Sequence, residues 1–228
     1  MNARNVAFAA SIALLAASAA AQANVAQSAA QTVQVVQSRA QNAALLKQYT
    51  WTERLDFMVN GQQKDLRLEL CNFGPDGKLQ RTVLNDQSAP LPGGFFRRKI
   101  AENKRKDVET YLKGLGELLR QYTLPTAGAV LDFMDSAATT PGPGGQVLMT
   151  GQSVVQPGDS ITIWVDAMTK KTRKVAVSTS FQGNPVNLTA TFKTLPNGLN
   201  YPAYADLTVP PKGYTILVQN FDYQMNGM

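Results

Sequence analysis

Side chains that could carry out acid–base or metal chemistry are few in this sequence. Histidine is absent, and Cys71 is the only cysteine among the 228 residues. Ser-His-Asp and Cys-His catalytic sites need histidine to accept a proton, and histidine and cysteine are the main zinc ligands. The sequence therefore excludes histidine-dependent catalysis and histidine or thiolate zinc sites, and we expect no metal and no cofactor.

Carboxylates and lysines remain as potential catalytic groups, because neither a carboxylate pair nor a Ser-Lys pair is excluded. A hydrolase would have to use carboxylates such as Glu53 or Asp166. Such sites depend on pairs of acids whose surroundings set their pKa values apart, and no recognisable motif marks a pair here. We therefore expect no catalytic residues. A hydrolase ranks third among our functional hypotheses, after the two binding roles described below.

A run of basic residues lies in the middle of the chain, and two interpretations of it stay open. Near an anionic membrane surface each cation contributes about 1 kcal/mol of attraction, so the run fits contact with lipid headgroups. The alternative is a solvated loop and helix start. The net charge of the chain is +6, but the sequence has no aromatic motif for stacking on bases. We therefore expect no nucleic-acid partner. The residues are Arg97, Arg98, Lys99, Lys104, Arg105 and Lys106.

A short apolar helix is predicted over residues 127–138, between Pro125 and the glycine- and proline-rich connector 139–145. Its apolar residues Val130, Phe133 and Met134 are candidate ligand contacts. If the helix is a lid, these side chains touch a ligand in an apolar cavity. If it is an ordinary amphipathic helix, they seal the core.

The elements around these residues indicate one mostly antiparallel domain over residues 24–228. Alternating apolar and polar residues predict a three-strand meander with strands at 51–59, 66–70 and 79–84. We expect Leu66, Leu68 and Leu70 to face the core and Arg67 to face water. A long amphipathic helix is predicted over 100–122, and another over 25–48. Five further strands follow, at 161–165, 175–181, 186–192, 201–209 and 214–218.

Three pieces of the sequence resemble a known family when taken together. They are the strand start Tyr49-Thr50-Trp51, the segment from Ile163-Trp164-Val165-Asp166 through a short turn to Arg173-Lys174-Val175, and the closing strands at Tyr201-Pro202-Ala203-Tyr204 and Tyr214. This order resembles the periplasmic lipoprotein carriers of the Lol type and their lipoprotein-sorting relatives. The resemblance implies an α+β fold, with an open, curved antiparallel half-barrel whose concave face is covered by helices. It also implies that acyl chains or other apolar cargo are held at this concave face.

The first functional hypothesis is thus an exported, non-enzymatic binding protein for an apolar ligand, such as a lipid or the acyl chains of a lipoprotein. The alternative is a periplasmic protein-interaction or regulatory module whose core is filled. An empty apolar cavity would favour the first of these two hypotheses.

Residues 1–23 have the pattern of a cleaved secretory signal peptide. Arg4 precedes an uncharged, alanine-rich stretch that ends in the small-residue pattern Ala21-Gln22-Ala23. The stretch is shorter and less apolar than the roughly 20 residues of a membrane span. No cysteine lies at the cleavage site to carry a lipid anchor. We therefore expect a periplasmic protein without an anchor or a membrane span.

Amino-terminal sequencing of the exported protein tests this expectation. The first residue should be Asn24 or one of its neighbours, because cleavage follows the Ala-x-Ala pattern. A periplasmic protein that still began at Met1 would contradict it.

Overall fold

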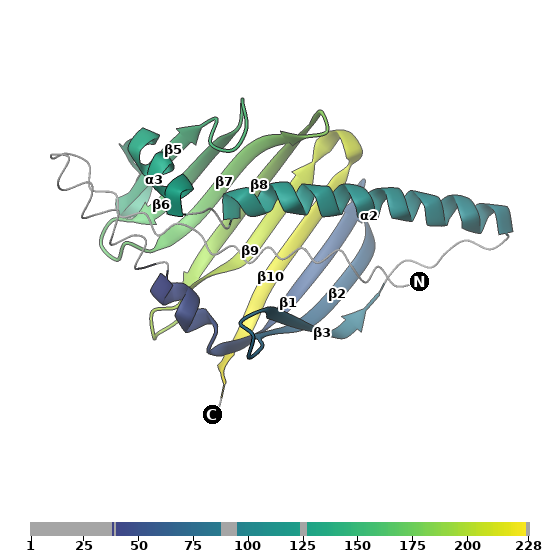
Figure 1. Ribbon diagram of the computed structural model, residues 1–228, viewed down its shortest axis with the longest axis horizontal. Coiled ribbons are helices and arrows are strands. Elements are labelled where there is room, and N and C mark those ends of the chain that lie inside the picture. The colour runs from purple at the N-terminus through teal and green to yellow at the C-terminus, as the bar shows by residue number, and fades with distance from the viewer. Residues whose placement is uncertain (1–37, 39, 88–94, 124–126, 227–228) are drawn as a thin grey trace.

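The computed structural model of the chain describes residues 38, 40–87, 95–123 and 127–226 (Figure 1). The predicted signal peptide and most of the predicted helix 25–48 lie outside the described residues, whereas residues 40–46 are helical as expected. Among the described helices, none has the length and apolar character needed to cross a membrane.

Ten antiparallel strands form one open, curved sheet in the order β3-β2-β1-β10-β9-β8-β7-β6-β5-β4 (Figure 1). The predicted α+β half-barrel is confirmed. The first three strands and the last one, which pairs with β1, are β1 (Tyr49–Val59), β2 (Gln62–Phe73), β3 (Leu79–Asp86) and β10 (Tyr214–Met225). The others are β4 (Ala138–Pro141), β5 (Gln146–Gln152), β6 (Ser160–Asp166), β7 (Thr172–Phe181), β8 (Asn184–Thr194) and β9 (Asn200–Val209).

The β1–β2 hairpin turns at Asn60 and Gly61, whose φ angles are 51° and 74°. An Asn-Gly pair suits this tight turn, because both residues tolerate positive φ. Such a turn brings the two strands into antiparallel register, and the alternation along each strand then separates the two faces of the sheet.

The predicted orientation of β2 is wrong. Leu55 on β1 lies opposite Arg67 in the strand register, and residues directly opposite each other share a face. Leu55 packs against the core, so Arg67 is the residue that points inward, and it is 8% exposed. The three leucines point to the convex side, where Leu70 is 37% exposed.

Two helices connect the meander to the rest of the sheet. Helix α2 (Phe95–Thr123) begins five residues before its predicted start. Helix α3 (Ala127–Ser136) ends two residues before its predicted end. Figure 1 shows α2 lying across the strands, with its N-terminal part extending past the outline of the sheet. Its buried stripe begins only at Tyr111 and continues through Leu112, Leu115, Leu119 and Tyr122.

The connector predicted over residues 139–145 is in part a strand. Its first residues belong to β4, which pairs with β5, and the short 3-10 helix η1 (Pro143–Gly145) completes the turn. The sequence prediction placed no strand at β5. This strand contains Gly151, which interrupts the run of apolar side chains by which strands are recognised.

The orientation of β2 makes a prediction about stability. Arg67→Asp should cost about 3–5 kcal/mol, because it breaks a buried ion pair and places a third acid beside Asp65 and Glu69. Leu68→Asp, on the convex side of the same strand, should cost less. Denaturant melts of the two variants measure both costs, and a larger loss for Leu68→Asp would refute the orientation.

Candidate functional site

The concave face of the sheet contains two parallel rows of inward side chains. One row runs from Ile163 on β6 through Val175, Ala190, Ala205 and Val218 to Leu55 on β1. Residues in register share a face, so each row forms one continuous surface across six strands. The second row is Ile161, Val177, Leu188, Leu207, Ile216 and Phe57. We call the two rows together the apolar floor.

Helices α2 and α3 pack on the apolar floor and form one hydrophobic core with it. Two glycines make this packing possible. A side-chain carbon on Gly114 of α2 would lie 2.7 Å from the ring of Phe181, and one on Gly151 of β5 would lie 2.7 Å from the ring of Phe133. Both positions must therefore stay without a side chain for the helices to approach the sheet this closely.

The three candidate ligand contacts on α3 lie on this packed side of the helix. Val130 is fully buried and Phe133 is 3% exposed, and both belong to the core beneath the helix. Met134 is half-buried and packs against the same core. Their side chains thus cover the apolar floor, where a ligand held between sheet and helix would have to lie.

A buried carboxylate fastens the C-terminal end of α2. Asp159 accepts hydrogen bonds from the backbone N–H groups of Val154, Val155 and Gln156 at 2.6–2.9 Å. The hydroxyl of Tyr122 donates to the same carboxylate at 2.5 Å. Burial raises the pKa of Asp159, but the Tyr122 and backbone hydrogen bonds outweigh it and leave this pKa below its usual value. Sequence reasoning did not find Asp159, because it lies in a loop without periodicity.

The middle of α2 is held by aromatic contacts. The ring of Tyr111 lies edge-on to Phe181 and Tyr214, with ring centroids 5.1 and 5.9 Å away. The ammonium of Lys212 lies 4.6 Å from the centre of the same ring. A cation this close to an aromatic face is attracted to it. Together with the Tyr122–Asp159 contact, these interactions anchor the C-terminal half of α2 to the sheet.

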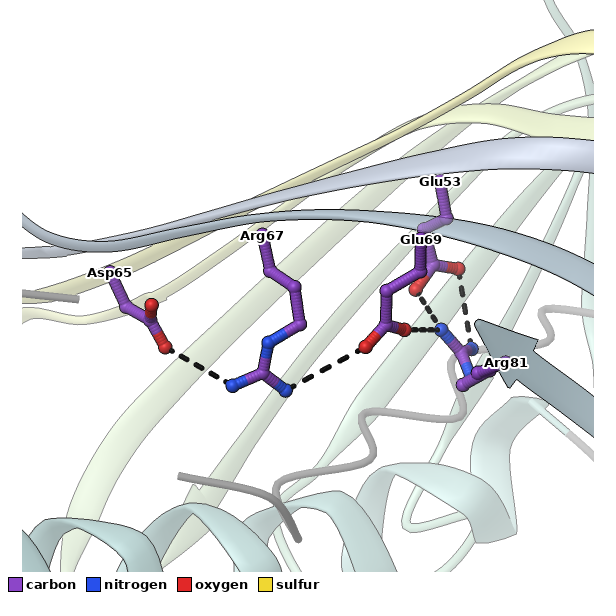
Figure 2. Close-up of polar contacts among 5 residues, drawn as sticks. All are labelled: Glu53, Asp65, Arg67, Glu69 and Arg81. Atoms are coloured by element: carbon purple, nitrogen blue, oxygen red, sulfur yellow. Dashed lines mark hydrogen bonds and ion pairs between the residues drawn. The ribbon is translucent and has the colours of Figure 1, made fainter. Parts of the chain in front are cut away.

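The inward face changes character beyond β1, where five charged residues form what we call the charged network (Figure 2). Arg81 of β3 bridges Glu53 of β1 and Glu69 of β2, with a 2.8 Å contact to Glu69. Arg67 lies 3.7 Å from Glu69 and 3.5 Å from Asp65. Figure 2 shows the four side chains of β1 and β2 extending from the side of the sheet that faces the helix, and Arg81 reaching from β3 toward Glu53 and Glu69. The apolar floor therefore ends against ion pairs.

The charged network lies largely out of water. Glu53 is 4% exposed. Burial raises the pKa of Glu53, an effect that the guanidinium of Arg81 opposes without cancelling. The pKa of Arg81 is raised as well, because the attraction of Glu53 and a hydrogen bond to it exceed the opposing effect of burial. Burial also raises the pKa of the neighbouring Cys71 thiol to about 12, so this thiol stays protonated at neutral pH.

An aromatic cluster adjoins the charged network along β1 and β10. Trp51 stacks on Tyr223 with ring centroids 5.6 Å apart and an interplanar angle of 7°. Tyr201 and Phe73 complete the contacts, at 4.2 Å from Tyr223 and 6.0 Å from Trp51. Trp51 and Glu53 are two residues apart on one strand and so share a face. The inward position of Glu53 could have been predicted from the sequence, because Glu53 lies two residues from both Trp51 and Leu55, which point inward.

The two acids considered for a hydrolase do not lie on neighbouring strands. Glu53 is on β1, whereas Asp166 ends β6, and β10, β9, β8 and β7 lie between these strands. Asp166 accepts hydrogen bonds from the backbone of Met168 and Thr169 and pairs with Arg173 at 2.9 Å. It therefore stabilises the β6–β7 turn. Among the described residues, no three acids or cysteines come together as a metal site.

The six basic residues all belong to α2. Lys104, Arg105 and Lys106 are exposed on the helix before its buried stripe begins. Arg97, Arg98 and Lys99 lie in its first two turns, where only the backbone is described. The structure thus places the basic run on the part of α2 that extends past the sheet in Figure 1.

Protein-family models and curated protein sequences give no match to this chain. Solved structures do. A DUF1329 family protein from Desulfovibrio piger is 9% identical, with a TM-score of 0.43, over 91% of this chain and 95% of that one. A putative outer membrane lipoprotein-sorting protein domain from Vibrio parahaemolyticus is 10% identical, with a TM-score of 0.37, over 82% and 91%. A LolA superfamily protein from Nitrosomonas europaea is 12% identical, with a TM-score of 0.32, over 84% and 94%.

The descriptions of the second and third of these structures name the group that the sequence resembles. The likeness is one of overall arrangement. What this chain binds has to be inferred from its own side chains.

The Tyr122–Asp159 contact makes a prediction about stability and its pH dependence. Tyr122→Phe removes a donor to a buried carboxylate and should cost about 1–3 kcal/mol at pH 7. Because the folded-state pKa of Asp159 is lowered, the stability it contributes is present above the unfolded-state value near 3.9 and is lost as the pH falls through the folded-state value. The cost of the substitution should therefore shrink in acid.

Denaturant melts of Tyr122→Phe at several pH values measure this cost. Tyr214→Phe is the matched control, since Tyr214 contacts Phe57 and Tyr111 through its ring. Equal losses for the two variants at pH 7 would contradict the role given to the Tyr122 hydroxyl.

Proposed function

We propose that this protein is an exported, non-enzymatic binding protein of the bacterial periplasm for an apolar ligand, such as a lipid or the acyl chains of a lipoprotein. The ligand lies on the apolar floor, between the sheet and helices α2 and α3. The observation that carries the proposal is the floor itself. It is a continuous apolar face across six strands, packed in the described structure against two helices rather than a second sheet.

Ligand entry requires helix contacts to be exchanged for ligand contacts. An acyl chain gains about 0.8 kcal/mol per methylene removed from water, so a long chain can replace the burial of several side chains. Helix α3 is the easier helix to displace, because it has ten residues and a helix of this length is marginal without its packing. Helix α2 is held by Tyr111 and Tyr122 and stays on the sheet.

Binding of this kind requires no proton transfer, which agrees with the absence of histidine from the sequence. The acids that a hydrolase would need are used in ion pairs and in the turn after β6. A non-catalytic role is therefore the simplest use of these groups.

The exposed basic part of α2 supports a second element of the proposal, contact with an anionic membrane surface. A projecting helix with three exposed cations in succession, at Lys104, Arg105 and Lys106, is attracted to anionic headgroups. In this arrangement the apolar floor and the basic helix segment face a membrane from which cargo is taken or to which it is delivered.

The second candidate function is a periplasmic protein-interaction or regulatory module with a filled core. The observation that favours it is the tight packing under α3, where Val130 is fully buried and Phe133 is 3% exposed. In this case the helices are permanent parts of the core, and no acyl chain replaces them.

Truncation of the α3 side chains distinguishes the two candidates. Phe133→Ala and Met134→Ala should weaken binding of a fluorescent fatty-acyl probe, because their side chains lie where the chain would pack. They should cost less stability than the deep-core control Leu115→Ala, for which about 2–5 kcal/mol is expected. Probe titrations and denaturant melts on the same samples measure both effects. A wild-type protein that binds no acyl probe would favour the interaction module.

Vesicle binding tests the membrane contact. The wild type should co-sediment with anionic vesicles at low salt and dissociate as salt screens the charges. Replacing Lys104, Arg105 and Lys106 by glutamine should abolish this binding without lowering the melting temperature. Lys64→Gln, an exposed charge on β2, is the control and should behave like the wild type. Unchanged binding of the triple variant would rule the contact out.

A further inference from the structure

Most of the sulfur that an oxidant could attack is kept away from the surface. Cys71 is fully buried, and burial raises the pKa of its thiol to about 12. It therefore supplies almost no thiolate, the form that oxidants attack. Met149 is 4% exposed. The half-buried methionines are Met58, Met134 and Met225. Among the described residues Met168 is the exception, because it is 92% exposed.

Met168 lies at the tip of the β6–β7 turn, which is closed without its side chain. The Oδ1 of Asp166 accepts hydrogen bonds from the backbone N–H groups of Met168 and Thr169 at 3.1 and 2.8 Å. The backbone N–H of Lys170 donates to the carbonyl of Asp166 at 2.9 Å. The backbone N–H of Asp166 donates in turn to the carbonyl of Lys171 at 2.9 Å. The main chain and one carboxylate thus hold the turn, and its structure does not depend on the thioether.

The exposed side chain of Met168 is too small to form a docking surface by itself. The residues that follow it, Thr169 and Lys170, are exposed and polar, and single apolar residues are normal on a protein surface. Exposure matters here for the chemistry of the sulfur atom. The reaction of a sulfur side chain with an oxidant depends on the access of the oxidant to it.

From these observations we propose that Met168 is a site of reversible oxidation, at which a two-electron oxidant such as hydrogen peroxide converts the thioether to a sulfoxide. One oxygen atom of the peroxide is transferred to the sulfur, which loses two electrons, and the peroxide is reduced to water. A methionine sulfoxide reductase restores the thioether. In that step two thiols are oxidised to a disulfide and the oxygen leaves as water. The inference is independent of the proposed function, because the reaction needs only the folded protein and an oxidant.

The position of Met168 allows the fold to tolerate its oxidation. A sulfoxide is polar, so it is accommodated in water at the tip of a turn but disrupts an apolar core. Met149 lies within the hydrophobic core, and Met134 of α3 packs against it. Oxidation of these two residues would therefore weaken the packing between α3 and the apolar floor. The structure thus separates a first, tolerated reaction at the surface from later damage to the core.

Graded treatment of the folded protein with hydrogen peroxide tests the site, with the oxidation of each methionine measured by mass spectrometry of its peptide. Met168 should react at least about tenfold faster than Met149, because the reaction follows the access of the oxidant. It should also react faster than the half-buried Met58, Met134 and Met225. In concentrated urea, where the chain is unfolded, the rates should become similar. Similar rates in the folded protein would overturn the proposal.

Two variants assign the fast reaction. In the fast phase, Met168→Leu should take up one oxygen atom fewer than the wild type, measured by the mass of the intact protein. Met58→Leu, at a half-buried methionine, is the matched control and should take up as much oxygen as the wild type in this phase. Melting temperatures confirm that both variants are folded. An unchanged fast phase in Met168→Leu would overturn the assignment.

Protein that is oxidised only at Met168 tests tolerance and reversal. Its melting temperature should equal that of untreated protein, and the two stereospecific methionine sulfoxide reductases with a thiol reductant should restore the thioether without unfolding. A lower melting temperature, or a sulfoxide that is reduced only after unfolding, would contradict the proposal. Failure of untreated protein to bind a fatty-acyl probe would instead contradict the carrier function and leave the oxidation site standing.

Discussion

An open sheet with an apolar concave face has to be covered, and this requirement governs the rest of the molecule. The apolar floor crosses six strands, and an uncovered surface of that extent would drive association with other molecules. Helices α2 and α3 lie on it, with Gly114 and Gly151 allowing the close approach. Beyond β1 the same face bears ion pairs instead. The floor thus has a polar boundary on one side, which limits where an apolar ligand can lie.

Most of the architecture follows from periodicity in the sequence. The alternation at Ile161, Ile163 and Val165 correctly predicts an inward row on β6, and the stripe from Tyr111 to Tyr122 predicts the buried side of α2. These patterns arise because a strand or helix with one dry face repeats its apolar residues at a fixed interval. The antiparallel order of the meander follows in turn from its short connections.

Apart from the inward position of Glu53, the charged network lay beyond what periodicity can predict. The alternation of residues separates the two faces of β2 but does not determine which face points inward. The face with the three leucines was predicted to be the buried one, because leucine is apolar. The answer depends on the residues that lie opposite Arg67 in the strand register, Leu55 on β1 and Asp86 on β3. Asp159 was missed for a related reason, since its role is defined by Tyr122, which is 37 residues away.

The central claim is that cargo displaces α3 from the apolar floor. Pulsed electron paramagnetic resonance between spin labels at Asp132→Cys on α3 and Asn187→Cys on β8 measures this directly, because both positions are exposed and Cys71 is fully buried. Addition of a fatty-acyl probe should produce a new, shifted distance population, whereas a control pair at Asn187 and Gln219 within the sheet should keep its distance. An α3–β8 distance that stays the same while the probe is bound would contradict the account.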